Sequence, residues 1–285
     1  MKAKIAAAAL FVLCASNCIF AQVSSGSARG NLILTGGDVG NGVIERFVAL
    51  AGGPDANFVY VPTAASSVRL PSGFIYDPPD SDTPAANTHA FAAELAKMFG
   101  VKHVTLLHTR SRKTANSETF VASLKKANGV WLGAGNAGRL ASAYLDTLTQ
   151  KEIKAVLERG GVVGGNSAGA IIQGSYTVRG RPDKPLLMAK GHERGFAFLK
   201  NVAINPHLTE AKRDAELVNV LDSYPRLLGI GLDEKAALVV TGDRFEVIGE
   251  GRAAIYDNKK HGGGNWYYWL KPGDRFDLRT RSVVQ

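Results

Sequence analysis

Short apolar runs alternate with longer amphipathic stretches along most of the chain, and each run ends at glycine, proline or polar residues. Strands that alternate with helices of about 10–15 residues are typical of βαβ units. The pattern therefore predicts an α/β fold in which a parallel sheet is flanked by helices. The predicted strands span residues 31–35, 58–61, 101–107, 130–132, 162–163, 202–204 and 227–232.

Helices are predicted between these strands at residues 87–99, 149–158 and 209–223. The second begins with Thr149 and Glu152 in the spacing of a capping box. In this motif both side chains accept hydrogen bonds from free backbone N–H groups at the start of the helix. The stretch 70–84 carries four prolines and is predicted to be a loop, either bordering a binding site or forming a plain surface insertion.

The pattern changes after Glu234. Residues 236–240 and 244–248 predict a hairpin around Thr241-Gly-Asp243, and residues 253–256 add a further strand. The glycine- and aromatic-rich stretch 262–269 has no clear pattern. We expect an additional C-terminal antiparallel β part joined to the parallel sheet within a single domain.

The first residues have the pattern of a secretory signal. Lys2 and Lys4 precede an apolar run to Ala15, and Ala21 is a suitable small residue for cleavage. This predicts a signal peptide over residues 1–21, a mature domain over residues 22–285, and export to the periplasm or the outside of the cell. A retained anchor is the alternative, although the run is shorter than the roughly 20 apolar residues of a spanning helix.

The cysteine content and the net charge limit the kinds of functional site that the chain can form. The two cysteines, Cys14 and Cys18, lie in the signal segment, so the expected mature chain has no disulfide, thiolate metal site or cysteine nucleophile. The formal charge of +9, or +7 without Lys2 and Lys4, is spread along the chain. It hints at an acidic substrate or surface and does not indicate nucleic acid.

The strongest local motif is Gly165-x-Ser167-x-Gly169, which follows an apolar strand and precedes Ala170-Ile-Ile172. Such a turn between strand and helix exposes a strained nucleophilic serine, and its glycines avoid collisions with neighbouring backbone. The amide of Ala168 would then point toward the oxyanion of a tetrahedral intermediate. The alternative is a glycine-rich turn that only joins the two elements.

A serine nucleophile needs a base and an orienting acid. Of six histidines, His207 follows a strand directly, and Glu234 follows another, so both are expected with Ser167 at the carboxyl edge of the sheet. Asp233 competes with Glu234 for the acid role, and a structural histidine is the alternative for His207. The order Ser, His, acid argues against an α/β-hydrolase lipase or esterase, which runs Ser, acid, His.

A second glycine-rich turn, Gly133-Ala-Gly-Asn136-Ala-Gly138, follows the strand at residues 130–132. Gly135 would offer a second amide to the oxyanion, and Asn136 would contact substrate. The spacing also fits a dinucleotide fingerprint, but the acid that binds ribose about 20 residues further on is missing. No cofactor and no metal are expected.

Together these motifs resemble peptidase family S51, the family of cyanophycinases and aspartyl dipeptidases. The resemblance spans about residues 31–257. It implies a fold like that of class I glutamine amidotransferases and suggests a homodimer. Ser167 would be the nucleophile, His207 the base and Glu234 the orienting acid. The segments that carry it are Leu34-Thr-Gly-Gly37, Tyr60-Val-Pro-Thr-Ala64, Gly133-Ala-Gly-Asn136, Gly164-Gly-Asn-Ser-Ala-Gly-Ala170, Asn205-Pro-His207 and Gly229-Ile-Gly-Leu-Asp-Glu234.

The resemblance implies hydrolysis next to an aspartyl residue. Cyanophycinases cut a poly-aspartate backbone whose β-carboxyls carry arginine and release β-Asp-Arg dipeptides. This chain departs from them at Asn205-Pro206 and at Ala211, where an arginine is expected, and Asn-Pro-His looks closer to aspartyl dipeptidases. Arg213 would bind a substrate carboxylate or lie solvated on a helix. A small-acyl esterase or amidase and an inactive binding protein are the remaining alternatives.

Overall fold

A nine-stranded sheet forms the centre of the molecule, in the order β16-β15-β12-β11-β1-β7-β6-β2-β5. The computed structural model describes residues 29–183 and 191–284, so the expected signal segment lies outside the described residues. The five strands β1-β7-β6-β2-β5, which are neighbours in this order, all pair in parallel, and this confirms the predicted α/β class. These five strands are β1 (Asn31–Thr35), β2 (Phe58–Val61), β5 (Val104–Leu106), β6 (Gly129–Leu132) and β7 (Val162–Asn166).

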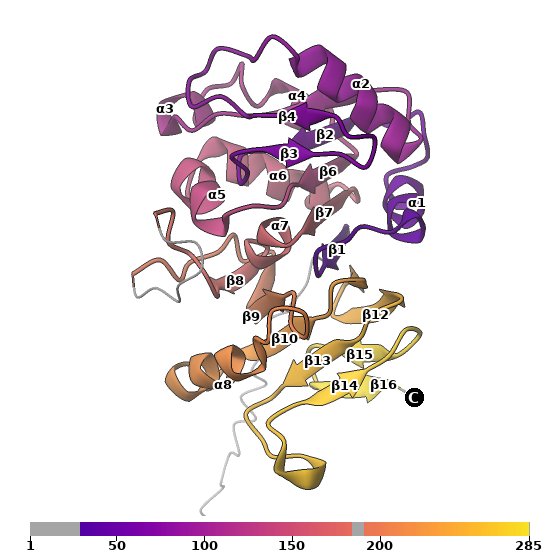
Figure 1. Cartoon of the computed structure of the whole chain (residues 1–285), viewed down its shortest axis with the longest axis vertical. Coiled ribbons are helices and arrows are strands. Elements are labelled where there is room, and N and C mark those ends of the chain that lie inside the picture. Colours follow the sequence, from indigo (N-terminus) through magenta and orange to yellow (C-terminus); the bar gives the residue numbers. More distant parts are fainter. Residues whose placement is uncertain (1–28, 184–190, 285) are drawn as a thin grey trace, which may run out of the picture.

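Both faces of the parallel strands are buried, which explains why their sequences are continuously apolar. In β1, Leu32 and Leu34 join one core cluster and Ile33 joins the other. The helices α1 and α2 cover the Ile33 face, while α5 and α6 cover the opposite face (Figure 1). The helices of this part are α1 (Asn41–Leu50), α2 (Thr88–Phe99), α3 (Arg112–Ala115), α4 (Ala122–Lys126), α5 (Ala137–Tyr144), α6 (Leu148–Glu158) and α7 (Ala168–Ile171).

The predicted C-terminal hairpin is present and extends the same sheet. The strands β11 (Ala236–Thr241) and β12 (Arg244–Gly249) pair antiparallel around the two residues Gly242 and Asp243. β11 also pairs antiparallel with β1, so the hairpin joins the parallel strands directly. The edge is completed by β15 (Arg275–Asp277) and β16 (Ser282–Val284).

A second sheet, which the sequence pattern did not separate from the first, has the order β14-β13-β10-β9-β8. Val202 and Ile204 of β9 face the core cluster of the first sheet, whereas Ala203 packs in the cluster that contains Leu217 and Val220 of α8. Because both faces of β9 are buried, its sequence resembles a strand of the first sheet. The elements are β8 (Gly174–Thr177), β9 (Leu199–Pro206), α8 (Asp214–Ser223), β10 (Leu228–Leu232), β13 (Ala253–Tyr256) and β14 (Tyr268–Leu270).

Three local predictions were wrong. Thr149 does not cap a helix: α6 begins one residue earlier, and the buried Thr149 hydroxyl donates to the Ala115 carbonyl at 2.8 Å. The predicted loop at 70–84 contains a strand, because β3 (Val68–Arg69) pairs with β4 (Ile75–Tyr76). The helix expected from residue 209 begins at Asp214, since Lys212 has a left-handed backbone with φ of 54°.

Residues 262–264, which had no clear pattern, form a single 3-10 turn before β14. None of the helices in residues 29–183 and 191–284 has the length and apolar character needed to cross a bilayer.

Candidate active site

Ser167 lies at the sharp turn between β7 and α7, as the motif predicts. Its backbone has φ of 52° and ψ of −110°, a region that costs a non-glycine residue about 1–3 kcal/mol. The turn is held by the Ser167 N–H, which donates to the Thr35 carbonyl at 3.2 Å. The surrounding structure therefore maintains a strained serine at the carboxyl end of a central strand.

The two glycines of the motif allow close backbone approach. A Cβ on Gly165 would lie 2.5 Å from the Gly169 carbonyl oxygen, and a Cβ on Gly169 would overlap the Leu132 carbonyl oxygen. Alanine at either position would push α7 away from β6 and β7. These glycines fix the elbow against the end of the neighbouring strand.

His207 and Glu234 meet Ser167 where the two sheets join. His207 follows β9 of the second sheet, and Glu234 lies in the short crossing from β10 to β11 of the first sheet. The Ser167 Oγ is 2.8 Å from His207 Nε2, and His207 Nδ1 is 2.5 Å from Glu234 Oε2. The three side chains thus form one continuous hydrogen-bonded chain, and each remains partly exposed.

Gly37 packs directly against this chain. The sequence analysis named it only within the segment Leu34-Thr-Gly-Gly37 and assigned it no part in the site. A Cβ at this position would overlap both Glu234 Oε1 and His207 Cε1. The amides of Gly37 and Asp38 each donate to the Glu234 carbonyl at 3.0 Å, which fixes the acid. The only signal in the sequence is the glycine pair after the first strand, which reads as an ordinary turn.

Asp233, the competing acid, is turned away from His207. Its carboxylate accepts hydrogen bonds from the Thr209 hydroxyl and from Arg252 Nε, the latter at 3.3 Å. Its neighbour Glu234 faces His207 instead. The geometry therefore selects Glu234 for the position that orients the imidazole.

The candidate oxyanion groups lie on two adjacent turns. Ala168 is the first residue of α7, so its N–H has no acceptor within that helix. Gly135, with φ of 136°, lies against the backbone of Ala64. The buried Asn136 side chain accepts from the Gly138 N–H at 2.8 Å and donates to the Arg181 and Pro182 carbonyls. Its side chain thus stabilises the turn. The Asn136 N–H donates to the Ala64 carbonyl at 2.9 Å and its carbonyl accepts from the Arg139 N–H at 3.1 Å, which leaves Gly135 as the candidate oxyanion donor of this turn.

A buried polar cluster supports the strand that carries His207. The Arg179 side chain is 6% exposed; it forms an ion pair with Glu216 and donates to Asn205 Oδ1 at 3.1 Å. Asn205 also donates to Glu216, at 3.1 Å. This cluster joins the segment after β8, the end of β9 and the first turn of α8. No sequence motif pointed to Arg179 or Glu216.

Arg213 lies at the start of α8, close to the candidate site. Its Nη1 donates to the Pro206 carbonyl at 3.0 Å, one residue before His207. Burial, followed by the neighbouring Arg179 cation, lowers the pKa of Arg213. Arg213 is thus tied to the backbone beside His207, with part of its guanidinium exposed.

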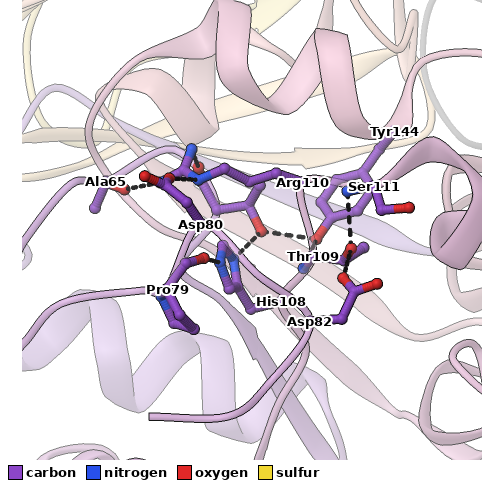
Figure 2. A network of polar contacts seen from close by, with 10 residues as sticks. Ala65, Pro79, Asp80, Asp82, His108, Thr109, Arg110, Ser111 and Tyr144 are labelled. Carbon is purple, nitrogen blue, oxygen red and sulfur yellow. Dashed lines mark hydrogen bonds and ion pairs between the residues drawn. The ribbon is translucent and has the colours of Figure 1, made fainter.

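A second polar network holds the backbone behind the Gly135 turn (Figure 2). The Thr63 hydroxyl is 2.8 Å from His108 Nδ1 and 2.7 Å from the Tyr144 hydroxyl, while Arg110 Nη2 donates to the Ala65 carbonyl at 3.0 Å. Ala64 lies between Thr63 and Ala65, and its carbonyl accepts a hydrogen bond from the Asn136 N–H at 2.9 Å. Burial lowers the pKa of His108 and raises that of Tyr144 to about 12.

Within residues 29–183 and 191–284, no three His, Cys, Asp or Glu side chains gather as a metal site would require. A cavity of about 270 Å³ opens beside the elbow and is lined by Gly37, Asn166 and Ala134 among others. A larger cavity of about 740 Å³ lies between α1 and β12, and Asp38 borders both. Space for a ligand therefore lies next to residues that adjoin Ser167, His207 and Glu234.

Known proteins of related sequence and structure define the class. The model of peptidase family S51 matches residues 32–248. The cyanophycinase of Geminocystis herdmanii (strain PCC 6308) is 26% identical over 239 residues, which cover 81% of this chain and 82% of that protein. The cyanophycinase of Nostoc sp. (strain PCC 7120 / SAG 25.82 / UTEX 2576) is 26% identical over 269 residues, 86% of this chain and 83% of its own length.

The crystal structure of a peptidase from an acI-B1 Actinobacterium has the same fold, with a TM-score of 0.64 and 21% identity over 89% of this chain and 98% of that chain. The structural match shows the fold, and the family match indicates a peptidase, and therefore a hydrolase. The chain belongs to peptidase family S51.

Proposed function

We propose that this protein is an exported serine peptidase that hydrolyses cyanophycin, or a related aspartyl peptide, to dipeptides of the β-Asp-Arg type. The observation that carries the proposal is the hydrogen-bonded chain from Ser167 through His207 to Glu234. The similarity to cyanophycinases supports the substrate class.

The reaction follows from this geometry. The Ser167 Oγ attacks the scissile carbonyl carbon, and His207 Nε2 accepts the hydroxyl proton. Glu234 accepts a hydrogen bond from His207 Nδ1–H and stabilises the imidazolium that forms. His207 then donates its proton to the leaving amine, the carbon–nitrogen bond breaks, and water hydrolyses the acyl-enzyme by the same proton transfers.

The negative charge on the tetrahedral intermediate needs donors that are already in place. The Ala168 N–H and the Gly135 N–H supply them in this proposal, because the Asn136 N–H is already bound to the Ala64 carbonyl. The left-handed φ of Ser167 sets the direction of the Ala168 amide. Arg213, half-exposed beside His207, is the candidate partner for a substrate carboxylate.

Mass spectrometry of the products from purified cyanophycin tests this proposal, because the product mass identifies both the cleaved bond and the side chain. We expect β-Asp-Arg with the wild type and none with Ser167→Ala. Release of no dipeptide from cyanophycin or from Asp-Xaa peptides by the folded wild type would contradict the proposal.

An α-aspartyl dipeptidase is the second candidate, favoured by Asn205 and Ala211. Asn205 is bound to Arg179 and Glu216, and Ala211 lacks the positive charge of the arginine that is expected at this position in cyanophycinases. In this case Asp-Xaa dipeptides are hydrolysed and cyanophycin is not. The same product analysis separates the two candidates.

Export is proposed from the signal pattern of residues 1–21. Intact-mass measurement of the protein from the periplasm or medium is expected to give a chain that begins at or near Gln22. A protein that stays in the cell with its first residues attached would contradict export.

A further inference from the structure

The cavity of about 270 Å³ lies beside the elbow. Asn166, in its wall, immediately precedes Ser167, and Ala134 belongs to the turn that carries Gly135. Gly37, also in its wall, packs against His207 and Glu234. A substrate group placed in this cavity therefore lies next to residues that directly adjoin the Ser167–His207–Glu234 chain.

The wall of the cavity is largely apolar and carries two opposite charges. Tyr60, Phe99 and Trp131 provide aromatic surface, and the charges belong to Asp38 and Arg69. Both charged side chains are exposed, and within residues 29–183 and 191–284 neither forms a hydrogen bond or ion pair through its side chain. Asp38 does have a cation in its neighbourhood, because it adds to the effect of Glu250 in raising the pKa of Lys235. An anion and a cation are thus available to a ligand on one apolar cavity.

Both charges are held on well-fixed backbone. Arg69 lies on β3, whose pairing with β4 is anchored where Tyr76 stacks on Phe91, with ring centroids 4.4 Å apart. The Asp38 N–H donates to the Glu234 carbonyl at 3.0 Å. The backbone positions from which the two charged side chains extend are therefore fixed relative to Ser167, His207 and Glu234, which favours recognition over chance exposure.

We propose that this cavity, the Asp38–Arg69 pocket, binds a substrate residue that carries both a carboxylate and a guanidinium group on an aliphatic stem. Arg69 binds the carboxylate, Asp38 binds the guanidinium, and the apolar wall contacts the methylene groups between them. An arginine attached to the substrate through its α-amino group has this chemistry. The assignment rests on the proposed function and names the side chains that select its substrate.

Substrate analogues that remove one charge at a time test each contact. The substrate is a synthetic β-Asp-Arg oligomer; one analogue has citrulline in place of arginine, and another has the arginine carboxylate as its amide. We expect Asp38→Asn and Arg69→Gln to lower kcat/KM on the oligomer by about 10- to 100-fold. Asp38→Asn no longer distinguishes arginine from citrulline, and Arg69→Gln no longer distinguishes the acid from the amide.

Arg46→Gln is the matched control, because Arg46 is an exposed arginine that lines only the larger cavity. It is expected to keep wild-type kinetics, and thermal unfolding verifies that every variant is folded. Wild-type kcat/KM and unchanged selectivity in both pocket variants would overturn the assignment while leaving the proposed function in place.

A binding measurement separates the pocket from the catalysis. Calorimetry with the Ser167→Ala protein and the β-Asp-Arg dipeptide is expected to show binding that weakens at least 10-fold when Arg69→Gln is added. If the wild type cleaves nothing but this pattern of binding is found, the proposed function fails and the pocket stands. Equal binding of the dipeptide with and without Arg69→Gln would contradict the assignment of Arg69 to this pocket.

Discussion

Gly37 shows how tightly single residues are fitted at this site. A Cβ at this position would overlap Glu234 Oε1 and His207 Cε1, so Gly37→Ala forces a methyl group against both side chains. A displacement of about 1 Å in a catalytic group lowers the rate about 100-fold. We expect kcat to fall by about that factor, measured by steady-state kinetics on whichever aspartyl substrate the wild type cleaves.

Gly42→Ala is the control for this substitution, because nothing lies within 4 Å of a Cβ on Gly42. It is expected to retain full activity and to be slightly more stable, since alanine favours the helix. Wild-type kcat in Gly37→Ala would show that the pair tolerates movement, contrary to the arrangement described.

At the residue scale, the sequence predicted which strand ends bring their side chains together, but it did not predict all the contacts between these side chains. Ser167 and His207 were identified because an elbow motif and a strand end mark them. The choice between Asp233 and Glu234 could not be made, because neighbouring residues differ only in the direction of their side chains. The direction depends on Arg252, which approaches Asp233 from a distant part of the chain.

Between elements, the ion pair of Arg179 and Glu216 joins the segment after β8 to α8 beneath His207. Glu216→Ala would leave the nearly buried Arg179 cation without its partner. Removing one member of a buried pair costs about 3–5 kcal/mol, so a loss of about 3 kcal/mol is expected in urea unfolding.

Glu158→Ala removes the exposed pair with Lys154 and is expected to cost less than about 0.5 kcal/mol. The Arg179→Met/Glu216→Met double variant should recover part of the stability lost in Glu216→Ala. An equal, small effect of Glu216→Ala and Glu158→Ala would mean that the Arg179 cluster does not support the β9–α8 junction.

The network of Figure 2 makes part of the stability depend on pH. Burial lowers the pKa of folded His108 below its unfolded value of about 6.5, so the unfolded state binds the proton more readily. The contribution of neutral His108 is complete above about pH 6.5 and is lost as the pH falls below that value.

Melting temperatures measured between pH 7.5 and pH 5 test this dependence. We expect His108→Gln to flatten the decrease on acidification, whereas His103→Gln, at an exposed position, leaves it unchanged. Identical pH profiles for wild type and His108→Gln would exclude His108 as a source of the decrease.

The element boundaries illustrate a different limit of sequence reasoning. Parallel strands and the C-terminal hairpin were predicted because periodicity and turn residues are local signals. The second sheet was not, because β9 is apolar on both faces whichever sheet it joins. Thr149 likewise matched a capping pattern, but its hydroxyl is bound to Ala115 through tertiary packing.

At the scale of the whole molecule, the chain passes repeatedly between the two sheets. It enters the second sheet at β8, returns to the first at β11, and crosses again at β13 and β15. Neither sheet is therefore a continuous segment, and the site at their junction exists only when both are formed.

This interleaving predicts a single cooperative unfolding transition. Trp131 reports on the first sheet and Trp269 on the second, so each can be followed in a variant that lacks the other tryptophans. The two urea transitions are expected to coincide with the loss of activity. Separate midpoints would show that the sheets unfold independently.

The claim on which this description depends is that Ser167 is activated by His207 and Glu234. Its most direct test is the turnover of folded Ser167→Ala on a substrate that the wild type hydrolyses. The hydrogen-bonded chain predicts that kcat falls by about 10⁴- to 10⁶-fold while the melting temperature stays close to that of the wild type. Turnover within a few-fold of the wild type would show that the reaction does not proceed through this serine.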